Sequence, residues 1–500
     1  GRTCAGTSGL RWHVAYRVLA WFLRLVTRVF FRQVEVVGLE NIPPGAVLFA
    51  GNHPNSLIDP MLIITTCGRR VHFAAKDALF KGRIMRVLLR GLGAVPVARK
   101  VEHDGHGASP PATAAPRDSA DMGRVNDAAF THMFDVLANG GAIGIFPEGL
   151  SHDESHLAKL KTGAARLALG GAAAAGRSIA VVPCGLTFIH PKRFRSRVLV
   201  QYGPPLEIGA RSEPEAVQEV TDDIDAALRR LTINAPDWET VRALDTVRRL
   251  YQPQEISIED RIELARRFNT YYAAVAAAPE VVSLMARVRA YQDKLDELGV
   301  SDRELAMDLS KREVTVRMMR HLVLVAWWLP LCLPGAPLHL PTVAFARMAG
   351  PRLTPRKDVI ATTKMLVGML LVLGSYAAAV AVLGWQLGVW FAIGAAIVLP
   401  LSGWATLRVL DRLRLVRRAF GVLARRLRFR SEVHALRAER ATLAADVIRI
   451  VTAVKPHDLE ALFPADKRDD PPETSRARRD ADLDDELDKD ATEARAEDDA

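Results

Sequence analysis

The residues best suited to chemistry are a histidine and an aspartate that lie close together in the chain, His53 and Asp59. A neutral imidazole can remove a proton from an alcohol, and a carboxylate on the other ring nitrogen fixes its tautomer and stabilises the imidazolium that forms. Such a pair is the base half of a Ser-His-Asp arrangement, with the hydroxyl supplied by the substrate. Two structural alternatives stay open. Asp59, before Pro60, suits a helix N-cap, and His53 could be a loop histidine bonded to backbone groups.

Three further stretches end apolar runs in residues that suit a phosphorylated or acylated substrate. One ends in Arg99, whose planar guanidinium matches a phosphate. Another is the turn F-P-E-G at residues 146–149, which carries a carboxylate, and the third, at 181–186, contains Pro183. Each alone is more often a solvated charge, a turn residue or a strand stop. Together, after successive predicted strands, they predict one site at the carboxyl edge of a sheet.

The elements that must position these residues alternate between strands and helices. Short apolar runs predict strands at residues 34–37, 46–50, 71–75, 94–98, 142–146, 179–183 and 198–202. Helical patterns predict helices near residues 60–66, 79–89, 127–139, 157–169 and 213–231. This alternation predicts an α/β domain at 33–232, with a mixed, largely parallel sheet flanked by helices. A Gly-, Pro-, Ala- and Ser-rich insert at 101–123 is predicted to be a flexible surface excursion.

The rest of the chain is predicted to be helical and partly embedded in a membrane. Residues 1–32, aromatic and Arg-rich, predict an interfacial amphipathic helix, with a core helix packed on the next domain as the alternative. After the α/β domain we expect a helical domain (233–320), a Pro-broken apolar membrane segment (321–347), a basic cytoplasmic loop (348–364), a two-helix transmembrane hairpin (365–407), basic membrane-proximal helices (408–463) and a disordered acidic tail (464–500). Whether 322–346 spans the bilayer stays open.

Charge indicates a membrane partner rather than nucleic acid. The net charge is +10, but the last 35 residues hold 15 acidic and 7 basic residues, so the first 465 carry +18. A basic body beside apolar spans suits anionic lipid or phosphorylated substrates, and no nucleic-acid recognition motif occurs in the sequence. Basic flanks on both sides of the hairpin place both of its ends in the cytoplasm. We therefore expect an integral membrane protein with its catalytic domain on the cytoplasmic face.

The cysteines predict neither a disulfide framework nor a zinc site. The chain has four, all widely separated in sequence: Cys4, Cys67, Cys184 and Cys332. No C-x-x-C pair occurs, so a reducing compartment fits and no bound metal is expected.

The four motifs, in this order, resemble those of the PlsC-type glycerophospholipid acyltransferases, H-x4-D, G-x5-R, F-P-E-G and V-P-x-x. The matching residues here are His53 with Asp59, Arg99, Glu148 with Gly149, and Pro183. Within this family the chain most resembles the fungal acyltransferases that use glycerol 3-phosphate and dihydroxyacetone phosphate. Three stretches carry this resemblance: F-P-E-G-x-S-H-D at 146–153, A-V-V-P-C-G-L at 180–186 and N-A-P-D at 234–237. The first motif departs from the general pattern, since five residues rather than four separate its His and Asp. The fungal branch shares this variation.

The resemblance implies a role for each motif residue. His53 would be the general base and Asp59 its orienting carboxylate, with the alcohol attacking the thioester of acyl-CoA or acyl carrier protein directly. Arg99 would bind the acceptor phosphate and Glu148, beside Gly149, its free hydroxyl. Pro183 would shape the acyl-donor side. No metal or cofactor is required.

Three alternatives stand beside this function. A 1-acylglycerol-3-phosphate acyltransferase, which makes phosphatidic acid, differs only in the acceptor. A catalytically inactive membrane lipid-binding protein is disfavoured because His53, Asp59, Arg99 and Glu148 are all intact. A serine hydrolase would need a G-x-S-x-G nucleophile elbow, which the sequence lacks.

Overall fold

The structure is a computed structural model that describes residues 5–97, 119–251, 258–300, 302–306, 311–354, 356–428 and 430–454. Arg99, most of the predicted insert 101–123 and the whole predicted tail 464–500 lie outside these residues. The chain forms two compact units. The first comprises Gly1–Asn234 and Leu353–Thr362, and the second comprises Ala235–Arg352 and Thr363–Ala500.

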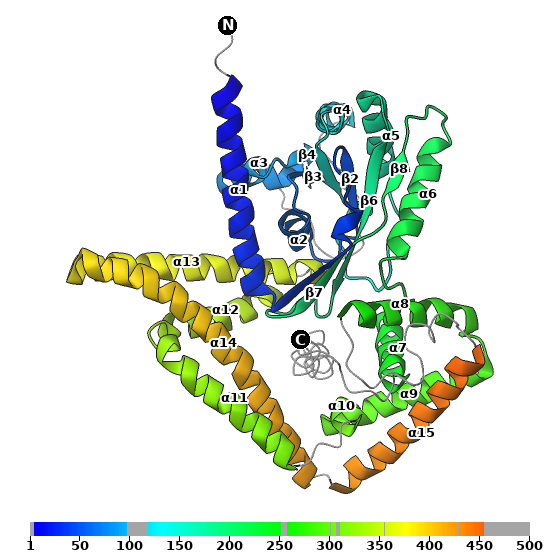
Figure 1. Cartoon of the computed structure of the whole chain (residues 1–500), viewed down its shortest axis with the longest axis vertical. Coiled ribbons are helices and arrows are strands. Elements are labelled where there is room, and N and C mark those ends of the chain that lie inside the picture. Colours follow the sequence, from blue (N-terminus) through cyan, green and yellow to red (C-terminus); the bar gives the residue numbers. More distant parts are fainter. Residues whose placement is uncertain are drawn as a thin grey trace. The chain divides into compact units, whose positions relative to one another are not determined.

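The first unit is built on a mixed eight-stranded sheet in the order β1-β7-β6-β2-β5-β3-β4, with β8 paired to β6 (Figure 1). Only the β6–β7 and β6–β8 pairs are antiparallel among the described strands. The strands are β1 (Gln33–Val37), β2 (Val47–Gly51), β3 (Val71–Lys76), β4 (Val95–Val97), β5 (Ala142–Ile145), β6 (Ile179–Phe188), β7 (Arg197–Tyr202) and β8 (Leu206–Ile208). The predicted α/β class with a largely parallel sheet is confirmed. β8 is three residues long and was not predicted.

Helices cover both faces of this sheet. On one face α4 (Ser119–Ala138), α5 (Gly163–Ala175) and α6 (Ala216–Arg229) pack together, and on the other lie α1 (Ala5–Phe30), α2 (Ile58–Thr66) and α3 (Arg83–Gly91) (Figure 1). Every residue of β2 is buried, as expected for a central parallel strand with a continuous apolar run. Leu48 and Ala50 join the core beneath α4, α5 and α6, whereas Phe49 packs against Tyr202. The central strand β2 thereby leads the chain directly to His53.

Several helices begin away from their predicted first residues. Helix α3 begins at Arg83 rather than near 79, and α4 begins at Ser119 rather than near 127, so the last residues of the predicted flexible insert 101–123 are helical.

The predicted start of α5 at residue 157 is wrong, because the N–H groups of Leu157, Ala158 and Lys161 donate to tertiary partners, which for Leu157 is the Asn234 side chain at 2.9 Å. Ala158 N–H donates to Glu148 Oε2 at 2.9 Å and Lys161 N–H donates to the Pro147 carbonyl at 2.7 Å. In α2 the N-cap position is Leu57, so the alternative role of Asp59 as the cap is also wrong.

Strand β6 continues beyond Pro183, where the sequence predicted its end. It pairs in parallel with β2 through Cys184 and then antiparallel with β7 as far as Phe188. The Pro183 carbonyl accepts a hydrogen bond from Gly203 N–H at 2.9 Å. A proline cannot donate a backbone hydrogen bond but can accept one. Pro183 lies between the residues of β6 that pair with β8 and those that pair with β7, where the missing N–H is tolerated.

Helix α1 has one buried and one exposed apolar face. Tyr16, Ala20 and Phe30 are buried in the first unit. The opposite face presents an exposed stripe at helical spacing, made of Val14, Val18, Trp21, Leu25 and Val29. One face of α1 packs on the domain, as a core helix would. The other face has the apolar composition of an interfacial helix.

The second unit contains a helical core and a group of apolar helices. The core is formed by α7 (Trp238–Tyr251), α8 (Ile258–Val275), α9 (Pro279–Leu298), α10 (Asp302–Ala306) and α15 (Arg430–Val454). Helix α15, in the segment predicted to be membrane-proximal, buries Val433, Leu443 and Val447 in this core. Asp302 joins the elements, because it accepts hydrogen bonds from Tyr291 at 2.8 Å and from Arg440 at 2.9 Å.

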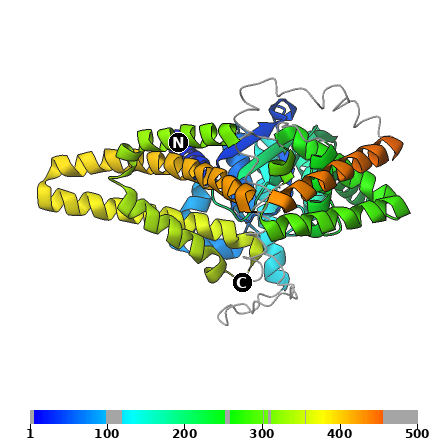
Figure 2. The same ribbon diagram turned by 90° about the horizontal axis from the view of Figure 1, so that it is seen from below.

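Two helices in the described part of the chain are long and apolar enough to cross a membrane, Lys357–Leu387 and Val389–Gly421. They contain most of α13 (Ile360–Leu387) and α14 (Val389–Arg428), which meet at Gly388 in a hairpin (Figure 2). Gly388 has φ +97°, which favours glycine at this turn. Helices α11 (Lys311–Cys332) and α12 (Ala336–Leu353) meet at a bend of 108° and together can count as a third span.

A buried polar cluster ties this bent pair to the hairpin. His339 of α12 hydrogen-bonds with Tyr376 of α13 at 2.7 Å and with Thr406 of α14 at 3.1 Å. Ser402 of α14 accepts a hydrogen bond from Gly335 N–H at the bend, at 2.8 Å. Such bonds satisfy polar groups among apolar helices and so hold the bend in place.

Candidate active site

His53 and Asp59 form a hydrogen-bonded pair at the carboxyl end of β2. His53 lies two residues beyond the strand and Asp59 in the first turn of α2. The His53 Nδ1–H donates to Asp59 Oδ2 at 2.8 Å, which leaves Nε2 as the ring atom that can accept a proton. The side chain of His53 is 14% exposed and that of Asp59 is fully buried. The extra residue of this motif is accommodated at Ser56, whose φ of +49° turns the loop back toward the imidazole.

The buried Asp59 carboxylate is held by two donors on a single oxygen. Besides His53, the Asn55 N–H donates to Oδ2 at 2.7 Å. Oδ1 is buried and has no hydrogen-bond partner among the described residues. Burial raises the pKa of Asp59 above its ordinary value, against the opposing effect of the His53 hydrogen bond and charge. The carboxylate is therefore maintained at a desolvation cost, which its two hydrogen bonds reduce.

An aromatic stack fixes the face of the imidazole. The His53 ring lies parallel to Phe146, with centroids 4.1 Å apart, and Phe146 in turn stacks on Phe73 at 5.6 Å. Small residues make room for this stack. A Cβ on Gly144 would lie 2.3 Å from the Phe73 ring, and one on Gly51 would lie 3.1 Å from Phe146. The stack and the Asp59 bond together set the direction in which Nε2 points.

Glu148 joins the F-P-E-G turn to the His53 loop. Its Oε1 accepts from the His53 backbone N–H at 2.7 Å, and its Oε2 accepts from the Ala158 N–H and from His152 Nε2. The residue is 2% exposed. Glu148 therefore fixes the backbone that carries the imidazole.

His152, four residues after Glu148, has an electrostatic link to the same site. Burial by itself lowers the pKa of His152, but the hydrogen bond and charge of Glu148 outweigh it, with help from Glu154 and Asp358, so the pKa is raised. The His152 N–H also donates to the His53 carbonyl at 3.2 Å. Residues 148–152 form no helix, so the i, i+4 spacing gives no helical reason for this contact, and the sequence offered no signal for the pair.

Three further polar residues close the loop and were not predicted as site residues. The Asn52 side chain accepts from the Leu186 N–H at 2.7 Å and donates to its carbonyl at 3.0 Å, which binds the His53 loop to β6. The Asn55 side chain donates to the Pro191 carbonyl at 2.9 Å. Ser151 Oγ accepts from the Ser56 N–H at 2.9 Å. Their partners are remote in the chain, so spacing alone gave no signal.

The structure brings most of the predicted site residues together. His53, Asp59 and Glu148 are linked by hydrogen bonds, and Gly149 completes the turn with φ +79°. Pro183 is buried in β6 opposite Ala50 in register, directly beneath the site. Arg99 lies outside the described residues.

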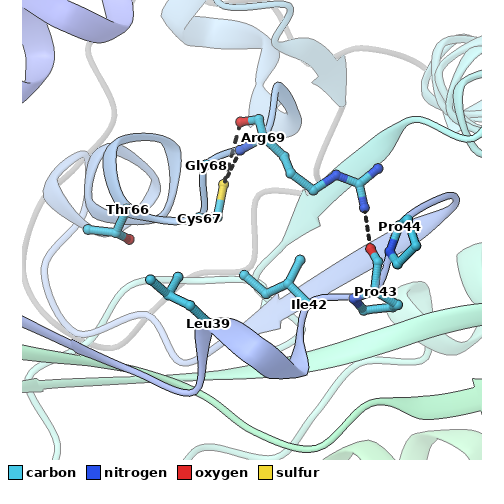
Figure 3. Close-up of a pocket in the computed structure, with 8 residues that line it drawn as sticks. All are labelled: Leu39, Ile42, Pro43, Pro44, Thr66, Cys67, Gly68 and Arg69. Carbon is cyan, nitrogen blue, oxygen red and sulfur yellow. Dashed lines mark hydrogen bonds between the residues drawn. The ribbon is translucent and has the colours of Figure 1, made fainter.

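The described residues hold no metal cluster, and a shallow pocket lies away from this site. The described residues contain no group of three or more His, Cys, Asp or Glu side chains that could hold a metal ion. A shallow pocket of about 400 Å³ is lined by Leu39, Ile42, Pro43, Pro44, Thr66, Cys67, Gly68 and Arg69 (Figure 3). It lies at the amino-terminal ends of β2 and β3, the sheet edge opposite His53, and Arg69 there donates to the Pro43 carbonyl at 2.8 Å.

Comparison with known proteins finds two families, each covering part of the chain. Residues 33–187 match the Acyltransferase family, and residues 243–459 match the glycerol-3-phosphate acyltransferase 2 C-terminal domain. The first match contains His53, Asp59 and Glu148, and the second contains the apolar hairpin.

Two curated relatives come from Saccharomyces cerevisiae. Glycerol-3-phosphate O-acyltransferase 2 is 32% identical over 271 residues, which are 49% of this chain and 36% of that protein. Glycerol-3-phosphate O-acyltransferase 1 is 26% identical over 456 residues, covering 71% of this chain and 59% of that protein. The chain therefore spans between about a third and three-fifths of the length of these relatives.

A solved structure, the 1-acyl-sn-glycerophosphate (LPA) acyltransferase PlsC from Thermotoga maritima, aligns with 45% of this chain and 81% of that chain, at 21% identity and a TM-score of 0.33. The two family matches, one after the other along the chain, and the similarity to the two yeast glycerol-3-phosphate O-acyltransferases support a PlsC-type acyltransferase of the fungal glycerol-3-phosphate acyltransferase kind.

Proposed function

We propose that this protein transfers a fatty acyl chain from acyl-CoA or acyl carrier protein to a hydroxyl of glycerol 3-phosphate, or of the related dihydroxyacetone phosphate. The observation that carries the proposal is the His53–Asp59 hydrogen bond of 2.8 Å, which uses Nδ1 of a partly exposed imidazole and leaves Nε2 for a substrate. A base oriented in this way suits an alcohol substrate. The names of the two yeast relatives support glycerol 3-phosphate as the acceptor.

The mechanism follows from the tautomer that Asp59 imposes. Nε2 accepts the proton of the acceptor hydroxyl as its oxygen attacks the thioester carbonyl, and Asp59 stabilises the imidazolium that forms. A new C–O bond forms, the C–S bond breaks, and the imidazolium returns its proton to the leaving thiolate. No acyl-enzyme is needed because the substrate supplies the nucleophile.

The acceptor is held, in this proposal, by residues around the F-P-E-G turn. Arg99 binds the phosphate as a forked donor, and Glu148 with Gly149 receives the free hydroxyl. Glu148 Oε1 accepts one hydrogen bond, from His53 N–H, and a carboxylate oxygen has two acceptor positions. Pro183, beneath His53, borders the acyl-donor side. Neither a metal nor a cofactor takes part in this scheme.

The apolar helices support a reaction that takes place at a membrane. Two potential spans and basic residues on both sides of the hairpin support membrane lipid as a partner and a cytoplasmic catalytic domain. A membrane-bound enzyme would release its acylated product directly into lipid.

The test uses the purified full chain in detergent with labelled oleoyl-CoA or oleoyl carrier protein, offered glycerol 3-phosphate, dihydroxyacetone phosphate and lysophosphatidate in turn. We expect labelled product with the first two acceptors and none in His53→Ala, while His434→Ala, an exposed histidine of α15, behaves as wild type. Transfer to lysophosphatidate alone would instead indicate a 1-acylglycerol-3-phosphate acyltransferase. No transfer to any acceptor, or substantial transfer by His53→Ala, would overturn the proposal.

A further inference from the structure

A short segment far from the family motifs belongs to the same compact unit as the His53 site. Residues 353–362, here called the strap, come about 200 residues after the F-P-E-G turn and outside the matched Acyltransferase region. They belong to the first unit, whereas nearly all of α12 before them and of α13 after them belongs to the second. Chain order alone would assign the strap to the C-terminal domain.

The strap contacts the site through Arg356 and Thr362. Arg356 Nη2 donates to the Ser151 carbonyl at 3.2 Å. The guanidinium is itself held by Asp358, with Nη2–Oδ2 at 2.8 Å and Nε–Oδ1 at 3.2 Å, and Asp358 is only 7% exposed. Thr362, also buried, donates from Oγ1 to the Asn55 carbonyl at 3.4 Å.

Both contacted carbonyls belong to residues that position the His53–Asp59 pair. Asn55 donates its N–H to Asp59 Oδ2 at 2.7 Å. Ser151 holds the loop at Ser56, and the next residue, His152, bonds both Glu148 and the His53 carbonyl. Thr362 is therefore linked to Asp59 through Asn55. Arg356 is linked to the His53 loop through Ser151 and its neighbour His152.

Burial distinguishes this arrangement from an ordinary surface ion pair. Arg356 is 55% exposed, and an exposed pair would contribute little. Asp358, however, is buried and bonded in a forked geometry, so the guanidinium is fixed where it meets the Ser151 carbonyl. The negative charge of Asp358 also faces His152 and contributes to raising the pKa of that imidazole.

We propose that Arg356, Asp358 and Thr362 are positioning residues for the His53–Asp59 pair, so that a segment about 300 residues further along the chain, within the same compact unit, supplies a part of the active site. The inference rests on the proposed acyl transfer. If the strap only stabilised the fold, removing its contacts would loosen the whole unit and change both KM and kcat. A positioning strap changes the alignment of Nε2 with the acceptor hydroxyl, which acts on kcat.

The kinetic test compares variants of the full chain in detergent. We expect Arg356→Ala and Asp358→Asn each to lower kcat about 10- to 100-fold, with KM for both substrates within about twofold, because misplacement of a reacting group has costs of this size. Arg356→Lys keeps one donor and should recover part of the loss. Arg352→Ala is the matched control, since it removes an exposed cation in the last turn of α12. Unchanged kcat in both variants, in an active wild type, overturns the inference.

A second measurement decides the inference even if the wild type transfers no acyl chain. Hydrogen exchange of the full chain should become faster in Arg356→Ala at the amides of Asn55, Ser56 and His152, which donate to Asp59, Ser151 and His53. Exchange elsewhere in the first unit should not change. Unchanged exchange at these three amides, or faster exchange throughout the unit, overturns the positioning role. An inactive wild type would count against the proposed function alone.

Discussion

His53 is held from three directions by residues of different elements. Asp59 fixes Nδ1, Phe146 fixes the plane of the ring, and Glu148 fixes the backbone N–H. Nε2 remains to exchange a proton with the substrate. Each support acts on a different degree of freedom of the imidazole, so removing one should misalign the base without unfolding the domain.

Substituting Asp59 should separate activity from stability. In Asp59→Asn the imidazolium loses its charge partner, so kcat should fall at least about 100-fold. Because burial raises the pKa of Asp59, the ionised carboxylate costs the folded state free energy near neutral pH, and the neutral amide removes that cost. The thermal unfolding temperature should therefore not fall. Asp223→Asn, on the exposed face of α6, is the control, and a large drop in unfolding temperature in Asp59→Asn alone would contradict this account.

The raised pKa of His152 predicts a pH dependence of stability. A histidine whose folded-state pKa is raised stabilises the fold fully below its unfolded value of about 6.5, and this contribution is lost as the pH rises through the folded value. The thermal unfolding temperature of the wild type should therefore decrease as the pH rises above about 6.5. His152→Gln keeps a donor for Glu148 but does not titrate, so its profile should be flatter. If the unfolding temperature of His152→Gln depends on pH in the same way as that of the wild type, the His152–Glu148 pair does not contribute. His434→Gln serves as the control.

At the scale of elements, the site depends on segments that do not continue regular structure. Residues 157–161 stay out of α5, where the Ala158 N–H donates to Glu148 and the Lys161 N–H donates to Pro147. Around Pro183 the antiparallel partner of β6 changes from β8 to β7, and the parallel pairing of β6 with β2 ends at Cys184. These irregular segments place hydrogen-bond donors beside the loops that follow β2 and β5 at the carboxyl edge of the sheet.

The F-P-E-G turn provides a test at this scale. Gly149 has φ +79°, and a Cβ there would lie 2.8 Å from Lys161 Cδ. Gly149→Ala should lower kcat more than tenfold and cost about 1 kcal/mol or more of unfolding free energy, since both the strained backbone and the contact oppose it. The matched control is Gly68→Ala, which has φ +71° but no atom within 4 Å of the added Cβ. Equal loss of activity in both variants would mean that the turn geometry is not specific to the site.

At the scale of the whole molecule, one chain combines an α/β unit with a unit that contains apolar helices. The family match at 243–459 contains both the helical core of the second unit and the apolar hairpin. Trp385 and Trp390 flank the hairpin turn and are largely exposed, which is typical of residues at a membrane interface. The two flanks of the hairpin should therefore lie on one side of the membrane and its turn on the other.

Glycosylation mapping in microsomes tests this orientation. An acceptor sequence in a short Gly/Ser loop inserted after Gly388 should be modified, because the turn is expected in the lumen. The same insert at the C-terminal end of the chain should remain unmodified, since basic flanks favour the cytoplasm. The opposite pattern would place the catalytic domain in the lumen and would contradict access to a cytoplasmic acyl donor.

Local pattern was sufficient to predict much of this protein. Each predicted strand from 34–37 to 198–202 is present, because short apolar runs between turn residues have few alternatives in a buried sheet. The H-x5-D and F-P-E-G motifs also identified His53, Asp59 and Glu148, which the structure joins by hydrogen bonds. The 43 residues at 365–407 without a charged side chain indicated the hairpin.

What the sequence by itself determined is therefore the set of elements and the chemical groups at the strand ends, since both depend on neighbours within a few residues. Only the tertiary structure decided that Asn52 closes on β6, that residues 157–161 remain outside α5, and that Arg356 and Thr362 return to the His53 site. Those contacts join residues up to 307 positions apart. No periodicity or spacing encodes them, because they exist only once the sheet has brought its loops to a common edge.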